Sequence, residues 1–445
     1  MRFSTAELAS QLQGELVGPD VTVDGASIDS RTIVAGQLFV PIEAARDGHD
    51  FIESALEAGA GAYLSARAPV GGTAIVVADT ASALESLGKL ARARLRGRVV
   101  GITGSVGKTT TKDLVRACFA STFTTSASIA SFNNELGVPL TMLNAPDDAE
   151  WVVLEMGARG PGHIRALCDV VRPHVGIVTS VAMAHVEFFG DLGGVARAKG
   201  ELVGALPPDG LAVLNVDDER VRAMADSSPC EVLGFGLGPD AAVRAGNVVL
   251  DGELRPRFSL HSPWGDTDVT LELRGAHQVS NALAAAAAAL ACGVPLDAVA
   301  GALGSVPAAS LRMEVRRRQG RPVVLVDCYN ANPASTASAL RSLAALDAHR
   351  RVALLGVMAE LGDETSAQHA SLRALADGLG IEVVGYRTDL FGPSRVDDVD
   401  EAVALLRRLG PDDAALIKGS RVTRLEAVAA ALDAAGPEAA VTAGA

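Results

Sequence analysis

The stretch Val99–Thr111, read as VVGITGSVGKTTT, decides the fold expected for this chain. Two β-branched residues lead into a glycine-rich turn, and apolar residues at helical spacing follow it. Gly104 and Gly107 allow a tight turn whose backbone N–H groups point inward, as a polyphosphate at a helix N-terminus requires. Lys108 would then meet the β- and γ-phosphates, and the Thr109 hydroxyl would complete the coordination of a Mg²⁺ ion. The pattern predicts a phosphate loop between a strand and a helix.

The glycine spacing of this loop differs from the usual motif, because Ile102 stands five positions before Gly107 and the nearest upstream glycine is Gly101. An accidental glycine-rich turn is the alternative interpretation. The apolar run before the turn and the helical pattern after it favour the phosphate loop, since that motif needs both. The residues expected to bind the nucleotide here are Gly104, Ser105, Val106, Gly107, Lys108, Thr109 and Thr110.

The length and the charge of the chain limit what the loop can belong to. A chain of 445 residues predicts about three domains, and 49% hydrophobic with 21% charged residues is ordinary for a folded protein. The formal net charge of -14 excludes a general nucleic-acid surface, which needs a basic face. An anionic ligand must therefore be bound by local cations and backbone N–H groups.

The cysteines and the apolar runs indicate the cellular compartment in which we expect this chain. Five cysteines lie far apart without a C-x-x-C pair, which predicts a reducing environment and neither a disulfide framework nor a zinc site. Residues 2–15 carry charge and helical periodicity, so we expect no secretory signal there. The longest apolar run, Ala282–Gly293, is too short to span a bilayer. The expected location is the cytoplasm.

The chain reads as three α/β domains. Residues 1–97 predict a small mixed domain with a linker, in which a helix over 5–12 precedes short strands near 21–28 and 37–41. Residues 98–309 predict a central parallel sheet with helices on its faces, and short alternating runs within 248–274 add a small antiparallel sheet. Residues 310–445 predict a second doubly wound, Rossmann-like unit with strands over 322–326, 351–355, 381–385 and 414–417.

Polar residues in the central domain follow predicted strands, where parallel sheets bind ligands. Glu155 ends the apolar run 151–154, and its carboxylate could hold Mg²⁺ or simply face solvent. His185 follows a strand predicted over 175–181 by four residues; a lone histidine is more often structural, but this one lies where the metal is expected. Lys199 is on a helical stretch, where a lysine is normally a solvated charge.

The same reasoning selects residues around the third domain. Asp327 ends the strand 322–326 and could accept hydrogen bonds from a ribose. Arg312, at the entry to the domain, is a candidate cation for a transferring phosphoryl group. The loop Lys418–Arg421 ends the last strand and would face an anion. His277 and Asn281 are four residues apart and share a helix face.

The triplet Asp29-Ser30-Arg31 follows a short strand in the first domain. Taken alone, it predicts a turn in which the Asp and Ser side chains bond their own backbone. A functional role for it does not follow from the residues themselves.

Several longer phrases, in this order along essentially the whole chain, resemble the Mur ligase family. They are GITGSVGKTT, SFNNELGVPLT, the Glu155-Met156-Gly157 strand end, AHVEFFG with ARAKGEL, GAHQVSNALAA, LRMEV, DCYNANPAST and KGSR. The phosphate loop of that family has the same shifted glycine spacing. FNNELGVPLT and DCYNANP point to the branch that adds a dipeptide, more than to the ligases that add earlier residues.

The resemblance implies an ATP-dependent, ADP-forming amide ligase of peptidoglycan precursor synthesis. Its substrates would be UDP-N-acetylmuramoyl-tripeptide and D-alanyl-D-alanine, its cofactors ATP and Mg²⁺, and its state a monomer. The peptide carboxylate would attack the ATP γ-phosphate to give an acyl phosphate, which the incoming amine would convert to an amide. Since anions must meet, charge neutralisation dominates the barrier, and the central and C-terminal domains would close to assemble the site.

The resemblance also implies roles for individual residues. Lys108, His185, Lys199 and Arg312 would be catalytic, with Lys199 carbamylated so that it supports a metal. Metal ligands would be Thr109, Glu155, His185 and the carbamate on Lys199. Asn281 would lie on the adenine side, Asp327 at the ribose and Arg312 at the γ-phosphate. The substrate residues would be Asp29, Ser30, Arg31, Asn133, Asn134, Asn330 and Asn332.

Three positions depart from the family pattern, and two alternative functions stay open. Ser180 replaces a frequent Asn, Cys328 a frequent acidic residue and Val357 a usual Asp. None removes a reacting group, but Val357 and Cys328 bear on the acceptor pocket, so a related ligase for another amine or UDP-linked acceptor is one alternative. The other is a nucleotide switch, because residues 191–194 match D-x-x-G; no N-K-x-D motif accompanies it.

Overall fold

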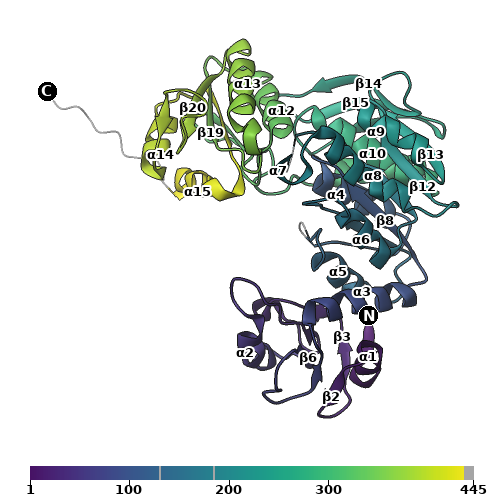
Figure 1. Ribbon diagram of the computed structural model, residues 1–445. Helices are drawn as coiled ribbons and strands as arrows, with labels where there is room; N and C mark the ends of the chain where they lie inside the picture. The colour runs from purple at the N-terminus through teal and green to yellow at the C-terminus, as the bar shows by residue number, and fades with distance from the viewer. Residues whose placement is uncertain (130–131, 184–185, 435–445) are drawn as a thin grey trace. The chain divides into compact units, whose positions relative to one another are not determined.

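The computed structural model describes residues 1–129, 132–183 and 186–434 (Figure 1). The described chain divides into two compact units, which are treated separately below. The first consists of Met1–Thr179, Ala196–Phe235 and Ala284–Val299, and the second takes the other described residues. Among the described residues, none of the helices combines the length and the hydropathy needed to cross a bilayer. The mixed α/β class predicted from the sequence is confirmed.

The first 97 residues contain a small mixed sheet with helices, and the boundary predicted for this domain stays a prediction. One sheet has the order β2-β7-β6-β5-β4, in which only the β2–β7 pair is antiparallel, and β1 pairs with β3 in a separate ribbon. The first helix spans the predicted residues and is capped by Ser4, which accepts from the Glu7 N–H group. The bounds are β1 Arg2–Ser4, α1 Thr5–Leu12, β2 Glu15–Val17, β3 Thr22–Asp24, β4 Ala26–Ser27, β5 Leu38–Phe39, α2 Ile52–Glu57, β6 Ala62–Ser65, β7 Ala74–Val76 and α3 Thr80–Arg94.

The central sheet is parallel across six strands in the order β13-β12-β11-β8-β10-β9. This confirms the doubly wound prediction, but one boundary was wrong: β11 ends at Val178, not at residue 181, and Thr179 directly after it hydrogen-bonds the phosphate loop through its side chain. The bounds are β8 Arg98–Thr103, α4 Lys108–Ala120, β9 Thr125–Ala127, α5 Gly137–Asn144, β10 Trp151–Glu155, α6 His163–Val171, β11 Val175–Val178, α8 Leu192–Gly204, β12 Leu211–Asn215 and β13 Glu231–Gly236.

The predicted antiparallel insertion is a three-stranded meander, β14 (Val243–Leu250), β15 (Pro256–Ser262) and β16 (Gly265–Thr270). The run 269–273 was expected to be its last strand, and this was wrong. A two-residue turn pairs Ser262 with Gly265, so the strand begins earlier and ends at Thr270. Two helices follow, α10 (His277–Ala291) and α11 (Leu296–Ser305).

The C-terminal domain is a second doubly wound unit with the strand order β17-β18-β22-β19-β20-β21, parallel except for β17. Alternate residues of β22 enter opposite cores: Leu416 packs with α12 and α13, whereas Ile417 packs with α14 and α15. The bounds are β17 Glu314–Arg316, β18 Val323–Val326, α12 Pro333–Ala344, β19 Arg351–Gly356, α13 Thr365–Gly378, β20 Glu382–Tyr386, β21 Arg395–Val396, α14 Val399–Arg407, β22 Ala414–Lys418 and α15 Glu426–Ala434.

Helix α5 joins the first domain to the central one through its last residue. Asn144 accepts from the Ala26 N–H group at 3.0 Å and donates to the Ala26 carbonyl oxygen at 2.8 Å. A Cβ atom on Gly25 would lie 2.3 Å from the Asn144 side-chain oxygen, so glycine is required there. The amide thus binds the backbone of strand β4 as a neighbouring strand would.

Candidate active site

The phosphate loop joins β8 to α4 as the sequence predicts. Gly104 has a φ of 147° and Gly107 a φ of 85°, values that other residues rarely adopt. Helix α4 begins at Lys108, whose Nζ atom donates to the Gly104 carbonyl oxygen at 2.8 Å. Residues 105–110 are partly exposed. The loop therefore presents a helix N-terminus and an ammonium group to solvent, which is a general binding site for phosphate.

Glu155 lies beside the loop because β10 pairs with β8. Its side chain is buried, and the Thr109 hydroxyl donates to Oε2 at 2.8 Å while the Asn133 amide donates to Oε1 at 2.7 Å. Carboxylate and hydroxyl oxygens are the ligands that Mg²⁺ prefers in proteins. Glu155 and Thr109 therefore fit a magnesium ion next to the loop, and the alternative of a solvent-facing Glu155 was wrong.

Two residues that the sequence analysis did not select support the loop from neighbouring strand ends. Thr179, directly after β11, donates from Oγ1 to the Val106 carbonyl oxygen at 2.6 Å. Asn215, the last residue of β12, donates from Nδ2 to the Thr179 carbonyl oxygen at 2.8 Å. The signal that could have found them is the one that found Glu155, a polar residue at the carboxyl end of a parallel strand.

Lys199 is 3% exposed, so the expectation that a helical lysine is solvated was wrong here. Burial and, to a lesser extent, the nearby Lys108 ammonium lower the pKa of Lys199 to about 7, and Glu201 opposes the shift. The structure therefore brings Lys199 into the electrostatic range of the phosphate loop. A lowered pKa favours the uncharged amine of Lys199 at a lower pH than for an exposed lysine.

Asn133 and Asn134 precede α5. The Asn133 carbonyl oxygen accepts from the Gly157 N–H group at 2.7 Å, and a Cβ atom on Gly157 would lie 2.9 Å from the Asn133 side chain. Asn134 accepts from the Gly137 N–H group at 3.0 Å. Asn133 is thus held against Glu155, whereas the Asn134 side chain bonds the backbone of the first residue of the helix.

In the second unit, Asp327 and Lys418 form a buried ion pair. Lys418 is 1% exposed and its Nζ atom lies 2.6 Å from Asp327 Oδ2 and 3.1 Å from the Asn330 carbonyl oxygen. The pKa of His277, nearby, is lowered mainly by burial; Asp327 opposes this shift and Lys418 adds to it. Lys418 thus compensates a partly buried carboxylate, and the anion-facing role of the loop Lys418–Arg421 stays a prediction.

Arg312 lies on a segment whose backbone contacts Asp327. Its guanidinium carbon is 4.0 Å from the centre of the Tyr329 ring, and the guanidinium carbon of Arg421 is 5.9 Å from that centre. Asp327 Oδ1 accepts from the Met313 N–H group at 3.2 Å, which ties the Arg312 segment to the strand end. The structure thus brings together the predicted ribose and γ-phosphate residues.

The other asparagines predicted to bind a ligand in this unit have hydrogen-bond partners nearby in the chain. Asn281 donates to Gln278 Oε1 at 2.8 Å on α10. Asn330 is exposed and accepts from the Ala331 N–H group, whereas Asn332 caps α12 by accepting from the Ser335 N–H group. Their predicted contacts with adenine or substrate stay predictions.

The triplet 29–31 forms the turn that the simpler interpretation predicts. Asp29 accepts from the Arg31 N–H group at 3.0 Å and pairs with its guanidinium at 2.6 Å, which keeps the pKa of Asp29 below its usual value. The Arg31 side chain is 85% exposed. The turn presents a guanidinium to solvent, and its contact with a sugar nucleotide is still a prediction.

His185 lies outside the described residues, so its predicted metal role is untested. Within the described part of the chain, Glu43, Asp47 and His49 are close enough to share an ion. However, His49 Nε2 accepts from the Ala66 N–H group and Nδ1 contacts Asp47 at 2.7 Å. Since both ring nitrogens are used, this cluster is a structural hydrogen-bond network.

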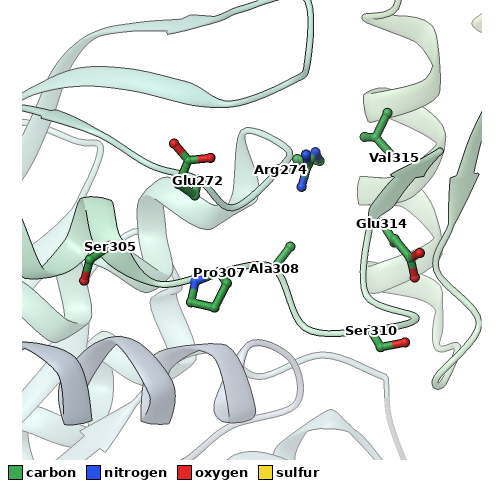
Figure 2. A pocket seen from close by; sticks show the side chains of 8 residues that line it. All are labelled: Glu272, Arg274, Ser305, Pro307, Ala308, Ser310, Glu314 and Val315. Atoms are coloured by element: carbon green, nitrogen blue, oxygen red, sulfur yellow. The ribbon is translucent and has the colours of Figure 1, made fainter. Parts of the chain in front are cut away.

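A pocket of about 520 Å³ adjoins the segment that carries Arg312 (Figure 2). Ser310, Glu314 and Val315 line one part of it, and Glu272 and Arg274 project from the segment after β16. The rest of the lining comes from Ser305, Pro307 and Ala308. Because its charges are mixed, the pocket alone does not define a ligand.

A phosphate loop with a buried carboxylate at the adjacent strand end defines the class of phosphate-loop nucleotide-binding proteins. Family models agree in order along the chain: "Mur ligase family, catalytic domain" matches residues 22–93, "Mur ligase middle domain" matches 102–289, and "Mur ligase, glutamate ligase domain" matches 311–421. The chain belongs to the Mur ligase family.

Relatives within that family are similar over nearly the whole chain. The UDP-N-acetylmuramoyl-tripeptide–D-alanyl-D-alanine ligase of Mycobacterium tuberculosis is 40% identical, with 91% of each chain covered. MurF from Acinetobacter baumannii has a TM-score of 0.88 at 28% identity, covering 98% of this chain and 99% of its own. The MurF ligase of Thermotoga maritima in complex with ADP has a TM-score of 0.82 at 27% identity, covering 93% and 97%. The family-level resemblance and the three-domain architecture are confirmed.

Proposed function

We propose that this chain is the ADP-forming ligase that joins D-alanyl-D-alanine to UDP-N-acetylmuramoyl-tripeptide. The observation that carries the proposal is the phosphate loop with Glu155 bound to Thr109 and with the low-pKa amine of Lys199 near Lys108. The similarity to named ligases supports the same substrates and the use of ATP. A nucleotide switch would leave this amine and the C-terminal domain unexplained.

In the proposed reaction, the tripeptide carboxylate oxygen attacks the γ-phosphorus of ATP, and ADP leaves. The dipeptide amine then attacks the acyl carbon, a C–N bond forms, inorganic phosphate leaves, and the amine proton passes to solvent. Lys108 and the first turn of α4 offset the charge of the phosphates, while Arg312 stabilises the charge on the transferring phosphoryl group. Mg²⁺ supplies further charge neutralisation when bound, and Thr109 and Glu155 would hold it.

Lys199 takes part as a carbamate in this proposal. Carbamate formation needs an uncharged amine, which adds to CO₂ and releases a proton. A pKa of about 7 provides that amine at neutral pH, whereas an ordinary lysine is almost entirely protonated. The product is an anion able to support a second metal together with His185.

The remaining assignments follow the same scheme. Residues 1–97 would bind the UDP-sugar through Asp29, Ser30 and Arg31, residues 98–309 would bind ATP, and residues 310–445 would complete the ligase site; the three family matches fall inside these limits. Asn133, Asn134, Asn330 and Asn332 would contact substrate, and Asn281 and Asp327 the nucleoside. The five unpaired cysteines support a reducing compartment, the cytoplasm. A monomer is proposed, and light scattering tests it.

The test is a phosphate-release assay with purified chain, ATP, Mg²⁺ and UDP-N-acetylmuramoyl-tripeptide, with and without D-alanyl-D-alanine. Release that requires the dipeptide, together with a product heavier by its mass less one water, supports the proposal. Release without the dipeptide indicates a nucleotide switch, and release with another amine alone indicates a related ligase. Lys108→Ala serves as the inactive control.

A further inference from the structure

The segment Leu311–Met313 holds Arg312 in an unusual backbone conformation. Leu311 has a φ of 60° and Met313 a φ of 50°, both in the left-handed region that residues other than glycine rarely occupy. Such conformations persist only where the surroundings over-determine them, and they are concentrated at functional sites.

The surroundings that fix this segment are hydrogen bonds to its backbone. The Leu311 N–H group donates to Glu314 Oε2 at 3.3 Å, and the Leu311 carbonyl oxygen accepts from the Tyr329 N–H group at 3.2 Å. The Arg312 N–H group donates to the Ala309 carbonyl oxygen at 3.2 Å, and the Met313 N–H group donates to Asp327 Oδ1 at 3.2 Å. The backbone position of Arg312 is therefore set, and Ser310 and Glu314 on either side of it line the pocket in Figure 2.

The side chain of Arg312 still has several rotatable bonds, and arginine carries a large rotamer entropy. Its guanidinium lies 4.0 Å from the centre of the Tyr329 ring, well inside the range of a cation–π contact. The Tyr329 N–H group donates to the Leu311 carbonyl oxygen. The residue that carries the ring is therefore held against the segment that carries the guanidinium.

We propose that Tyr329 is a positioning residue, whose aromatic face orients Arg312 before the phosphoryl group arrives. This inference rests on the proposed function, in which Arg312 stabilises the charge on the transferring phosphoryl group. A guanidinium that is already oriented needs no reorganisation at the moment of reaction, so its contribution is greatest in the transition state. The aromatic ring, and not the phenolic hydroxyl, performs this role.

The test compares Tyr329→Phe, which keeps the aromatic face, with Tyr329→Leu, which removes it. Tyr329→Leu is expected to lower kcat by about 3- to 30-fold, the range that a cation–π contact provides, with KM for the dipeptide unchanged. Tyr329→Phe is expected to retain most of the rate. If the Leu variant does not fold, Tyr329→Met supplies the same comparison with a bulkier aliphatic side chain.

A double-mutant cycle with Arg312→Ala decides whether Tyr329 acts through Arg312. The loss caused by Tyr329→Leu is expected to vanish once Arg312 is absent. The inference is overturned if the Leu variant matches wild type, if the Phe variant falls as far as the Leu variant, or if the losses multiply. By contrast, dipeptide-independent phosphate release by the wild type, or a wild-type rate for Arg312→Ala, would overturn the proposed function itself.

Discussion

Lys199 in the first unit and Lys418 in the second are both almost completely withdrawn from water, yet their neighbours differ. Lys418 is 1% exposed and lies 2.6 Å from a carboxylate oxygen of Asp327. Lys199 is 3% exposed and lies within the field of another ammonium, that of Lys108, which helps to lower its pKa to about 7. The comparison shows that burial alone does not decide what a lysine does. Lys418 forms an ion pair with a carboxylate, whereas burial and then the Lys108 ammonium lower the pKa of Lys199, and Glu201 opposes that shift.

The largest effect is expected from removing the reactive amine. Lys199→Ala should lose about a thousandfold in ligation rate, because the proposed carbamate can no longer form and its charge stabilisation is lost. Phosphate release in the presence of dipeptide measures the effect, and added bicarbonate should not restore it.

Lys89→Ala is the matched control for that variant. Lys89 is on an exposed face of the first unit and pairs with Glu85, so this variant should keep the wild-type rate. A Lys199→Ala enzyme with full activity would remove the carbamate from the mechanism.

Removing the structural ammonium should act on stability instead. Lys418→Met leaves the Asp327 carboxylate buried without its cation and should lower the free energy of unfolding by about 3 kcal/mol. Denaturant titration measures this loss. The double variant Lys418→Met/Asp327→Asn should recover part of it; equal stability of the single variant and the wild type would mean that the pair contributes nothing.

The pH dependence of stability provides the next test. The folded pKa of Lys199 is about 7, below its unfolded value near 10.5. The unfolded chain therefore binds more protons between these values, and the free energy of unfolding should rise with pH in that window by up to about 1.4 kcal/mol per unit. The destabilisation is fully present below pH 7 and is lost as the pH approaches 10.5.

Lys199→Met isolates this contribution. In CO₂-free buffer the variant should be more stable than the wild type by about 4 kcal/mol at pH 7, and the difference should shrink to about 2 kcal/mol at pH 9. Denaturant midpoints of both proteins at the two pH values measure it. A difference that does not vary with pH would show that Lys199 is not withdrawn from water in the folded protein.

The smallest effect is expected at Thr179, which supports the phosphate loop without a charge. Thr179→Val removes the hydrogen bond to the Val106 carbonyl oxygen and should raise KM for ATP about fivefold, the equivalent of about 1 kcal/mol. Thr179→Ser keeps the hydroxyl and should stay close to wild type. Equal KM values for the Val and Ser variants would exclude this role.

Local patterns were sufficient to predict most of the fold. The strand–turn–helix around Gly104 and Gly107, the strand ending at Glu155 and the second doubly wound unit all depend on short-range periodicity and on glycine conformation. The predicted strand end at residue 181 was wrong: the strand ends at Val178, and the next residue, Thr179, bonds Val106, 73 positions away in the chain.

The candidate site was less accessible to sequence reasoning for the same physical reason. Nothing near Lys418 in the sequence indicates that Asp327, 91 positions earlier, will take its charge. Likewise, the sequence around Lys199 predicts a solvated lysine on a helix, whereas packing in the folded chain buries this side chain. Partner choice in a folded interior depends on which segments meet, and a local pattern does not contain that information.

Helix α5 sets a fixed distance between two segments of the first unit. Asn133 and Asn134 precede its first turn. At its last turn, Asn144 hydrogen-bonds the backbone of Ala26, three residues before Asp29. Its eight residues span about 12 Å, a length that an α-helix can hardly stretch. The helix therefore fixes the distance between the Asn133–Asn134 segment and strand β4, so these two parts of the first unit keep a constant spacing.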